Sequence, residues 1–185
     1  MMKTLFGLFL AAGVLTMTTA AEAGDPVNTL YMQLESGRVV IEMRPDLAPL
    51  HVERIRELTR QKFYDGVVFH RVIDGFMAQT GDPTGTGSGG SGEKIRAEFS
   101  PPSKAKHIRG VVSMARAQSR DSADSQFFIC FKASPFLDGQ YTIWGQVVEG
   151  MDLVDKIKKG DEGNNGKVTE PDHIVTMRVA ADVKE

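Results

Sequence analysis

A glycine-rich stretch in the middle of the sequence has the residue types and spacing of a cofactor site. Residues 85–90 (GTGSGG) match the pattern G-x-G-x-x-G, whose glycines let a backbone approach the pyrophosphate of a dinucleotide. That use requires a strand before the glycines and a helix after them, but Asp82-Pro83 predicts a turn before the match and no helical periodicity follows it. We therefore interpret residues 81–92 as a flexible surface loop. A nucleotide-dependent enzyme is a rival hypothesis, which a nucleotide-induced shift of the melting temperature would test.

Residues that bind metals or act as nucleophiles occur without the spacings that those functions need. The four histidines show no H-E-x-x-H pattern, and residues 161–172 resemble a calcium loop only faintly because Gly163 occupies a ligand position. No G-x-S-x-G elbow is present, and the single cysteine, Cys130, excludes an intrachain disulfide and a multi-thiolate metal site. We expect Cys130 to be a buried residue without chemistry, and we expect the protein to use no metal and no cofactor.

Three longer blocks combine arginine with aromatic, methionine and glutamine residues. They are residues 69–82 (FHRVIDGFMAQTGD), residues 113–117 (SMARA) with 124–129 (DSQFFI), and residues 136–139 (FLDG) with 144–145 (WG). In these blocks the sequence closely resembles the cyclophilin family of peptidyl-prolyl cis-trans isomerases, and the resemblance extends over about residues 29–181. Among its members, the sequence is most similar to bacterial periplasmic cyclophilins.

The resemblance implies two groups of site residues. The catalytic group is Arg71, which matches the family's catalytic arginine, together with Gln79 and Phe76. In the substrate-binding group, the residues that match the wall of the proline pocket are Met77, Phe128 and Leu137. Gln126 matches a polar group that faces the substrate backbone, and Ala115 and Arg116 match the segment that runs alongside the bound peptide.

Three positions depart from the best-known eukaryotic pattern. Phe136, also assigned to the substrate-binding group, stands where those members carry tryptophan, and Tyr141 of the same group stands where they carry histidine. Arg116 replaces an asparagine, but the family uses the backbone of that residue, so we expect the change to be tolerated.

The implied chemistry is consistent with these residue types. Rotation about a peptide bond faces a barrier of about 18–20 kcal/mol from amide resonance, and no bond is broken, so no nucleophile is required. The enzyme must favour the twisted amide, whose nitrogen lone pair accepts a hydrogen bond, over both planar forms. The guanidinium of Arg71 is a permanent donor, and Gln79 can orient it or hold the substrate carbonyl. Apolar residues around the proline ring exclude water and strengthen the effect of the charge.

Simpler roles fit each residue when it is considered alone. Arg71 fits a solvated charge on a strand, and for Phe69, Phe127 and Trp144 we prefer a place in the core. Because Arg71 and the other candidate site residues occur together in the family's order, their catalytic and substrate-binding roles are favoured over these simpler ones. The alternative function is a non-catalytic chaperone module that binds proline-containing peptides in the same groove without turnover.

Strand patterns dominate the chain after residue 24. Alternating apolar residues and turn signals predict strands at residues 30–34, 38–43, 67–72, 76–79, 95–99, 111–115, 126–131, 142–148 and 173–181. Helical periodicity predicts helices at residues 49–62 and 151–159, with Gly160 capping the second. We expect a mainly β fold: a closed eight-stranded antiparallel β-barrel capped by two α-helices, an arrangement that leaves no exposed sheet edge.

Composition excludes several classes of protein. The chain has 185 residues, 41% of them hydrophobic and 25% charged, as in a single folded domain. Its net charge of −2 gives no support for nucleic acid as a partner, since that mode of binding needs a basic surface. We expect the partners to be proline-containing unfolded or extended polypeptides, and we expect a monomer.

The N-terminus has the three parts of a secretory signal peptide. Lys3 supplies the positive charge, residues 5–15 the apolar run, and Ala21-Glu22-Ala23 the small residues of a cleavage site. We expect residues 1–23 to be removed, so that residues 24–185 form a single cyclophilin-like isomerase domain in a bacterial periplasm. No lipobox cysteine precedes Gly24, so we expect no stable membrane insertion after cleavage.

Phe136 generates a prediction about inhibition. The family is known for binding cyclosporin, and the tryptophan of its best-known members can donate an N–H that Phe136 cannot. One such hydrogen bond contributes about 1 kcal/mol, which is a factor of about five in affinity. Phe136→Trp should therefore tighten cyclosporin binding by about this factor in a calorimetric titration, and an unchanged affinity would contradict the prediction.

Overall fold

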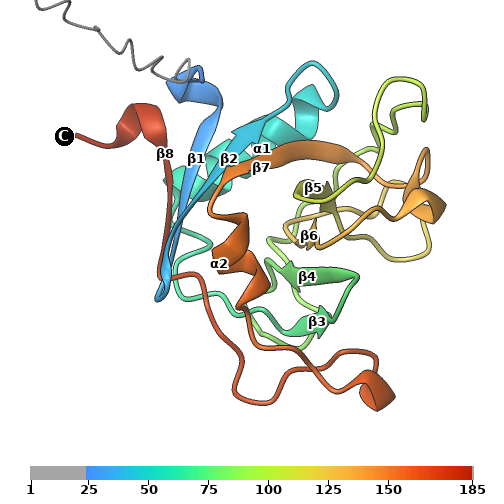
Figure 1. Ribbon diagram of the computed structural model, residues 1–185. Helices are drawn as coiled ribbons and strands as arrows, with labels where there is room; N and C mark the ends of the chain where they lie inside the picture. The colour runs from blue at the N-terminus through green and yellow to red at the C-terminus, as the bar shows by residue number, and fades with distance from the viewer. Residues whose placement is uncertain (1–23, 185) are drawn as a thin grey trace, which may run out of the picture.

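The computed structural model describes residues 24–184, which form one eight-stranded antiparallel sheet with two helices (Figure 1). The strand order is β3-β4-β6-β5-β7-β2-β1-β8. The strands are β1 Thr29–Leu34, β2 Gly37–Met43, β3 Arg71–Ile73, β4 Met77–Thr80, β5 Val111–Met114, β6 Phe127–Cys130, β7 Ile143–Glu149 and β8 Thr176–Val179. The helices are α1 Pro49–Arg60 and α2 Met151–Asp155, and short 3-10 turns occur at η1 Pro26–Asn28, η2 Pro135–Leu137, η3 Glu162–Asn164 and η4 Ala180–Asp182. The predicted mainly β class is confirmed.

The sheet curls into a half-barrel, so the expectation of a closed barrel was overstated. Its edge strands β3 and β8 are not paired with each other in the part of the chain that the structure describes. The irregular segment 160–175 lies between these edges instead. Phe69 N donates to Asp172 O (2.8 Å), and Ile174 N donates to Val67 O (2.9 Å). These bonds occupy residues that were expected to extend a strand over 67–72, which explains why β3 has only three residues.

Other predicted elements are shorter than expected or missing. Residues 95–99 form no strand, and only Ile95 makes an isolated bridge, with Ala123. The helix predicted over 151–159 ends at Asp155, because Lys158 N donates instead to the carboxylate of Asp172 (2.7 Å). Gly160 does not cap that helix, since its N–H donates to Val72 O (2.9 Å).

The core lies inside the curl of the sheet and continues under both helices. Helix α1 packs against β7 and β8, and α2 packs against β2. The apolar stripe predicted for α1 is buried, and so are the three aromatic residues assigned to the core, Phe69, Phe127 and Trp144. Between residues 24 and 184, no helix has the length and apolar character needed to cross a bilayer.

Helix α1 is capped from outside its own sequence. Its N-cap residue, Ala48, makes no side-chain cap bond. The Glu98 carboxylate accepts hydrogen bonds from Leu50 N (3.1 Å) and His51 N (3.0 Å), and it lies 2.6 Å from His51 Nδ1. A carboxylate at this end satisfies free N–H groups and interacts favourably with the helix dipole. Glu98 thus fixes the start of α1 to the segment that was expected to be a strand.

We predict that Glu98→Ala lowers the free energy of unfolding by about 2 kcal/mol, because it leaves helix N–H groups without an acceptor. Glu93→Ala is the matched control, since the Glu93 side chain is 69% exposed and pairs only with Arg54, whereas Glu98 is 12% exposed. The control should cost less than about 1 kcal/mol. Urea denaturation measures both, and equal losses would contradict the capping role.

Candidate active site

One cleft brings the predicted site residues together. It has a volume of about 400 Å³ and is lined by residues of β3, β4 and β6, by the segment after β5, and by the turn around η2: Arg71, Phe76, Met77, Gln79, Ala115, Arg116, Phe128, Phe136, Leu137, Gln140 and Tyr141. Every predicted catalytic or substrate-binding residue is in this lining except Gln126. Gln140 was not anticipated.

The floor of the cleft is an apolar pocket. Met77, Phe128 and Leu137 are buried there and form a cluster separate from the main core. Tyr141 meets Phe128 edge-on, with ring centroids 5.9 Å apart. At the rim, the Phe136 side chain is 63% exposed, and its ring lies 5.4 Å from that of Phe76. The pocket therefore has a buried apolar floor and an aromatic rim, which suits a small apolar ring.

Cys130 lies directly behind this pocket. It is fully buried and belongs to the same apolar cluster as Met77. Burial raises the pKa of its thiol to about 12, with a smaller contribution from the charge of Asp138. At neutral pH the group is a protonated thiol, so it packs as an apolar residue and is a poor nucleophile.

Arg71 is held at the side of the pocket by three hydrogen bonds to neutral acceptors. Strand β3 pairs with β4, so that Arg71 lies opposite Gln79. Its Nη1 donates to Gln79 Oε1 (3.1 Å), its Nε to Asn165 O (3.0 Å), and its Nη2 to Asn165 Oδ1 (2.9 Å). Partial burial lowers the pKa of Arg71, but a guanidinium remains protonated in proteins. The cleft thus contains a fixed, permanent positive charge.

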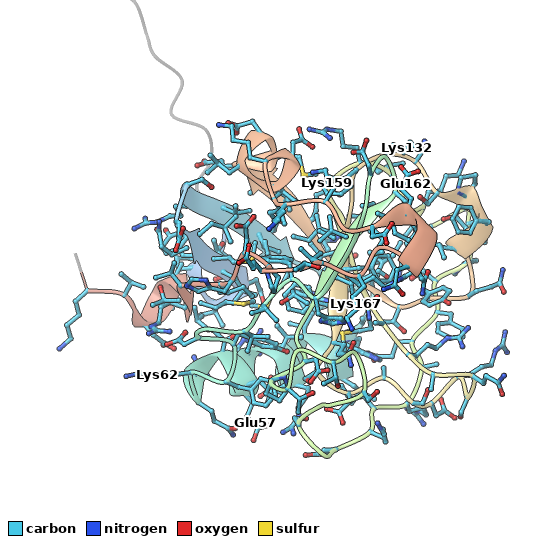
Figure 2. The ribbon with its side chains drawn as sticks, turned by 90° about the horizontal axis from the view of Figure 1, so that it is seen from below. Glu57, Lys62, Lys132, Lys159, Glu162 and Lys167 are labelled. Carbon is cyan, nitrogen blue, oxygen red and sulfur yellow. The ribbon has the colours of Figure 1, made fainter. Side chains whose placement is uncertain are left out.

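Asn165 was missed by the sequence analysis. It follows η3 and has a positive φ of 53°, a conformation that asparagine tolerates better than most residues. The turn is visible in Figure 2 between the labelled side chains of Glu162 and Lys167. The pair Asn165-Gly166 signals a turn in the sequence, but no local pattern indicates that this turn reaches a residue 94 positions earlier.

Gln126 is not in the cleft lining, but it contacts Gln79, which is. Its Oε1 accepts a hydrogen bond from Gln79 Nε2 (2.9 Å). Its Nε2 donates to Gly87 O (3.0 Å) and Gly89 O (2.8 Å). The amide groups of Gln79 and Gln126 therefore link Arg71 to the glycine-rich loop.

That loop, residues 81–92, is held in place by hydrogen bonds, in contrast to the flexible loop that we expected. The Asp82 carboxylate accepts hydrogen bonds from Thr84 N (2.8 Å), Gly87 N (2.6 Å) and Gly89 N (3.1 Å). Burial raises the pKa of Asp82, but these bonds outweigh it and hold the pKa at about 2. The glycines of the G-x-G-x-x-G pattern thus surround a carboxylate of their own chain.

Behind the pocket, a buried serine and a buried histidine join a partly buried aspartate, and the three are linked as in the catalytic triad of a serine hydrolase. His107 Nδ1 is 2.9 Å from Asp138 Oδ1, and His107 Nε2 is 3.0 Å from Ser113 Oγ. Ser113 and His107 are both buried, and Ser113 Oγ also bonds to Thr142 O, so no substrate reaches the hydroxyl. The His107 ring stacks on Phe128 with centroids 6.3 Å apart. The cluster therefore supports the pocket wall.

Comparison with known proteins agrees with this fold. A family model described as "Cyclophilin type peptidyl-prolyl cis-trans isomerase/CLD" matches residues 29–179. The chain belongs to this family. Its activity is accordingly peptidyl-prolyl cis-trans isomerisation.

Named relatives cover most of the chain. A probable peptidyl-prolyl cis-trans isomerase of Brucella suis biovar 1 (strain 1330) is 50% identical over 188 residues, which is 95% of this chain and 94% of the relative. A peptidyl-prolyl cis-trans isomerase of Helicobacter pylori (strain ATCC 700392 / 26695) is 44% identical over 138 residues, or 72% of this chain and 83% of the relative.

Solved cyclophilin structures have the same fold. Cyclophilin AquaCyp293 from Hirschia baltica matches with a TM-score of 0.76 and 29% identity, covering 87% of this chain and 77% of its own. A cyclophilin-type isomerase from Cryptosporidium parvum, crystallised in the presence of the dipeptide Ala-Pro, matches with a TM-score of 0.73 and 28% identity. That match covers 82% of this chain and 98% of the Cryptosporidium protein.

Asn165 provides a test of how Arg71 is positioned. Asn165→Gly keeps the positive φ accessible and removes only the side-chain acceptor. Since a hydrogen bond to a charged group contributes about 1.5 kcal/mol, we predict that kcat/KM for an Ala-Pro peptide falls about tenfold. Asn164→Ala is the control on the same turn and should leave the rate unchanged. Full activity of Asn165→Gly would show that Gln79 and the backbone suffice.

Asp82 generates a prediction about pH. Its pKa of about 2 in the folded protein lies below the unfolded value of about 3.9, so its contribution to stability is complete above pH 4 and is lost as the pH falls toward 2. Asp82→Asn should lower the free energy of unfolding by about 2 kcal/mol at pH 7, and the difference from the native protein should shrink below pH 4. Urea denaturation at several pH values measures this difference. The exposed Asp74→Asn is the control, and a pH-independent difference would contradict the prediction.

Proposed function

We propose that the protein isomerises X-Pro bonds of exported polypeptides, with Arg71 as the catalytic donor. The observation that carries the assignment is that the Arg71 guanidinium is fixed beside an apolar pocket within one cleft. This geometry matches the requirement of the reaction, which is a permanent hydrogen-bond donor next to a site that holds the proline ring.

The proposed mechanism starts with the proline ring in the pocket formed by Phe76, Met77, Phe128 and Leu137. As the amide twists, its nitrogen loses conjugation with the carbonyl and gains a localised lone pair. The Arg71 guanidinium donates to this nitrogen, an interaction that the planar amide does not offer, so the donor favours the transition state over both ground states. Gln79 holds Arg71 in position during this change, and the pocket excludes water that would weaken the interaction.

A solved structure with a similar fold supports proline-containing peptides as the class of substrate. The Cryptosporidium parvum cyclophilin was crystallised in the presence of Ala-Pro, and its fold matches this chain over 82% of its length. By this likeness we propose proline-containing unfolded or extended polypeptides as substrates, bound by a monomer that assists their folding.

Arg71→Ala tests the mechanism against simple binding. Removing one preorganised donor from a transition state costs about a hundredfold or more in rate, so we predict at least that loss in the cis-to-trans relaxation of an Ala-Pro peptide. Binding of the same peptide, followed by titration, should largely survive because the apolar pocket is intact. Arg120→Ala is the control for loss of an exposed positive charge outside the cleft lining. If Arg71→Ala retains full turnover, the mechanism is wrong; if the native protein binds peptides without turnover, the chaperone-module alternative holds.

The proposal of a periplasmic location rests on the sequence of residues 1–23, which lie outside the described residues. Their charged, apolar and small-residue segments match a secretory signal. Expression of the full chain in a Gram-negative bacterium, followed by fractionation and mass spectrometry, should yield a periplasmic product beginning at Gly24. A charged substitution in the apolar run, Leu8→Arg, should retain the uncleaved chain in the cytoplasm. A native chain that stays uncleaved in the cytoplasm would refute the proposal.

A further inference from the structure

Two arginines line the cleft, and both donate only to neutral acceptors. The bonds of Arg71 go to Gln79 and Asn165, as described above. The guanidinium of Arg116 donates to the main-chain oxygens of Ala117 (2.9 Å), Gln118 (3.2 Å) and Gln140 (3.1 Å). None of the ion pairs found between residues 24 and 184 includes either arginine. The cleft therefore carries two positive charges without a counter-charge from the described chain.

Carboxylates close in sequence to the lining lie outside it. Asp138 follows Leu137 but accepts hydrogen bonds from His107 N (2.7 Å) and faces its ring. Asp121 accepts from Ala97 N (2.8 Å). Asp74, in the turn before Phe76, is exposed and does not line the cleft. The cleft lining itself contains no aspartate or glutamate. An anionic group entering this cleft thus meets positive charge that no internal acid neutralises.

Arg116 is already ordered before any ligand enters. Besides its three carbonyl partners, its guanidinium lies over the ring of Tyr141, 4.6 Å from the centroid, and it is only partly exposed. A planar guanidinium held in this way loses little conformational freedom when a carboxylate binds to it. Partial burial also reduces screening by water, so the attraction exceeds that of a free surface arginine. These properties distinguish Arg116 from Arg120, which is exposed and does not line the cleft.

The strand order sets the distance between the two charges. Arg71 is on β3 and Arg116 follows β5, which lies three strand positions away in the order β3-β4-β6-β5. Adjacent strands are about 4.8 Å apart, so the two backbones are separated by about 14 Å, whereas an extended peptide advances about 3.4 Å per residue. When the proline lies beside Arg71, a substrate residue up to about three positions away from it can therefore reach Arg116, because the lengths of the substrate side chain and of the Arg116 side chain add to the reach of the backbone.

We propose that Arg116 is a specificity-determining residue, which selects proline-containing segments that carry an aspartate or glutamate within about three residues of the proline. This inference rests on the proposed function, because it assumes that the proline ring occupies the pocket beside Arg71. Arg71 acts at the amide nitrogen in that function, so Arg116 is the cation left to receive a substrate carboxylate. The substitution of arginine for the usual asparagine then adds a side-chain function to a segment that the family uses through its backbone.

The test compares matched peptides that differ in one charge. Peptides containing Ala-Pro are prepared with Glu, Gln or Lys at each position up to three residues on either side of the proline, and kcat/KM is measured for each. At low ionic strength we expect one or more Glu peptides to exceed their Gln counterparts by about fivefold, with the Lys peptides below both. In about 1 M salt, where the Debye length is about 3 Å, the ratio should fall toward one.

Three variants assign the effect to its source. In Arg116→Gln the Glu-to-Gln ratio should fall to about one, and using a ratio removes any general loss of activity from the comparison. Arg116→Lys keeps the charge and should retain part of the preference, which shows that the loss in Arg116→Gln does not come from a disturbed fold. Arg120→Gln changes the net charge by the same amount and should keep the native ratio and the native rate on Gln peptides.

The outcomes distinguish a failure of the proposed role of Arg116 from a failure of the proposed isomerase function. Turnover of neutral Ala-Pro peptides with no Glu preference at any position would overturn the role of Arg116 and leave the isomerase function intact. A preference that persists in Arg116→Gln, or that disappears equally in Arg120→Gln, would also overturn it. Absence of turnover with every peptide would overturn the proposed function, and titration with the same Glu and Gln peptides would then decide whether Arg116 selects acidic segments for binding alone.

Discussion

A positive charge that cannot be neutralised, held still beside an apolar pocket, is the constraint that the rest of this structure satisfies. The side chain of arginine has many rotamers, so a fixed guanidinium requires acceptors on more than one side. Here one acceptor comes from the neighbouring strand, through Gln79, and the others come from a distant turn, through Asn165. Because all of these partners are neutral, the charge is positioned without being cancelled. A carboxylate in their place would hold Arg71 equally well and would remove much of its effect on a substrate.

The half-barrel explains how such distant groups meet. Strands β4 and β6 are adjacent in the sheet although they are separated in the sequence, and their residues Met77 and Phe128 form the floor of the pocket together with Leu137 of η2. The segment between the open edges of the sheet carries Asn165 to Arg71, since the main chain around Lys167 forms an isolated bridge with Arg71. A fully closed barrel would pair β3 with β8 and leave no place for this segment. The incomplete closure is thus directly connected with the positioning of the charge (Figure 1).

The sequence predicted those features that depend on local patterns or on long family blocks. The class of fold, the amphipathic face of α1, the buried aromatic residues and nearly all of the cleft lining agree with the structure. It did not predict contacts that tertiary structure alone creates. Asn165 reaches Arg71 across 94 positions, Glu98 caps α1 through Leu50, which is 48 positions before it, and His107 supports Phe128 through stacking. Residues 95–99 alternate like a strand, yet they pair with no strand because their polar groups serve the helix and the neighbouring loop.

The wall behind the pocket has a further consequence for an isomerase of polypeptides. A polypeptide with a free cysteine would, under oxidising conditions, form a mixed disulfide with a reactive thiol near the binding site. Cys130 lies behind the side chains of the pocket floor, and its sulfur is both inaccessible and protonated. The enzyme can therefore release such a polypeptide without becoming covalently attached to it, and the geometry of its pocket does not depend on the redox state of its surroundings.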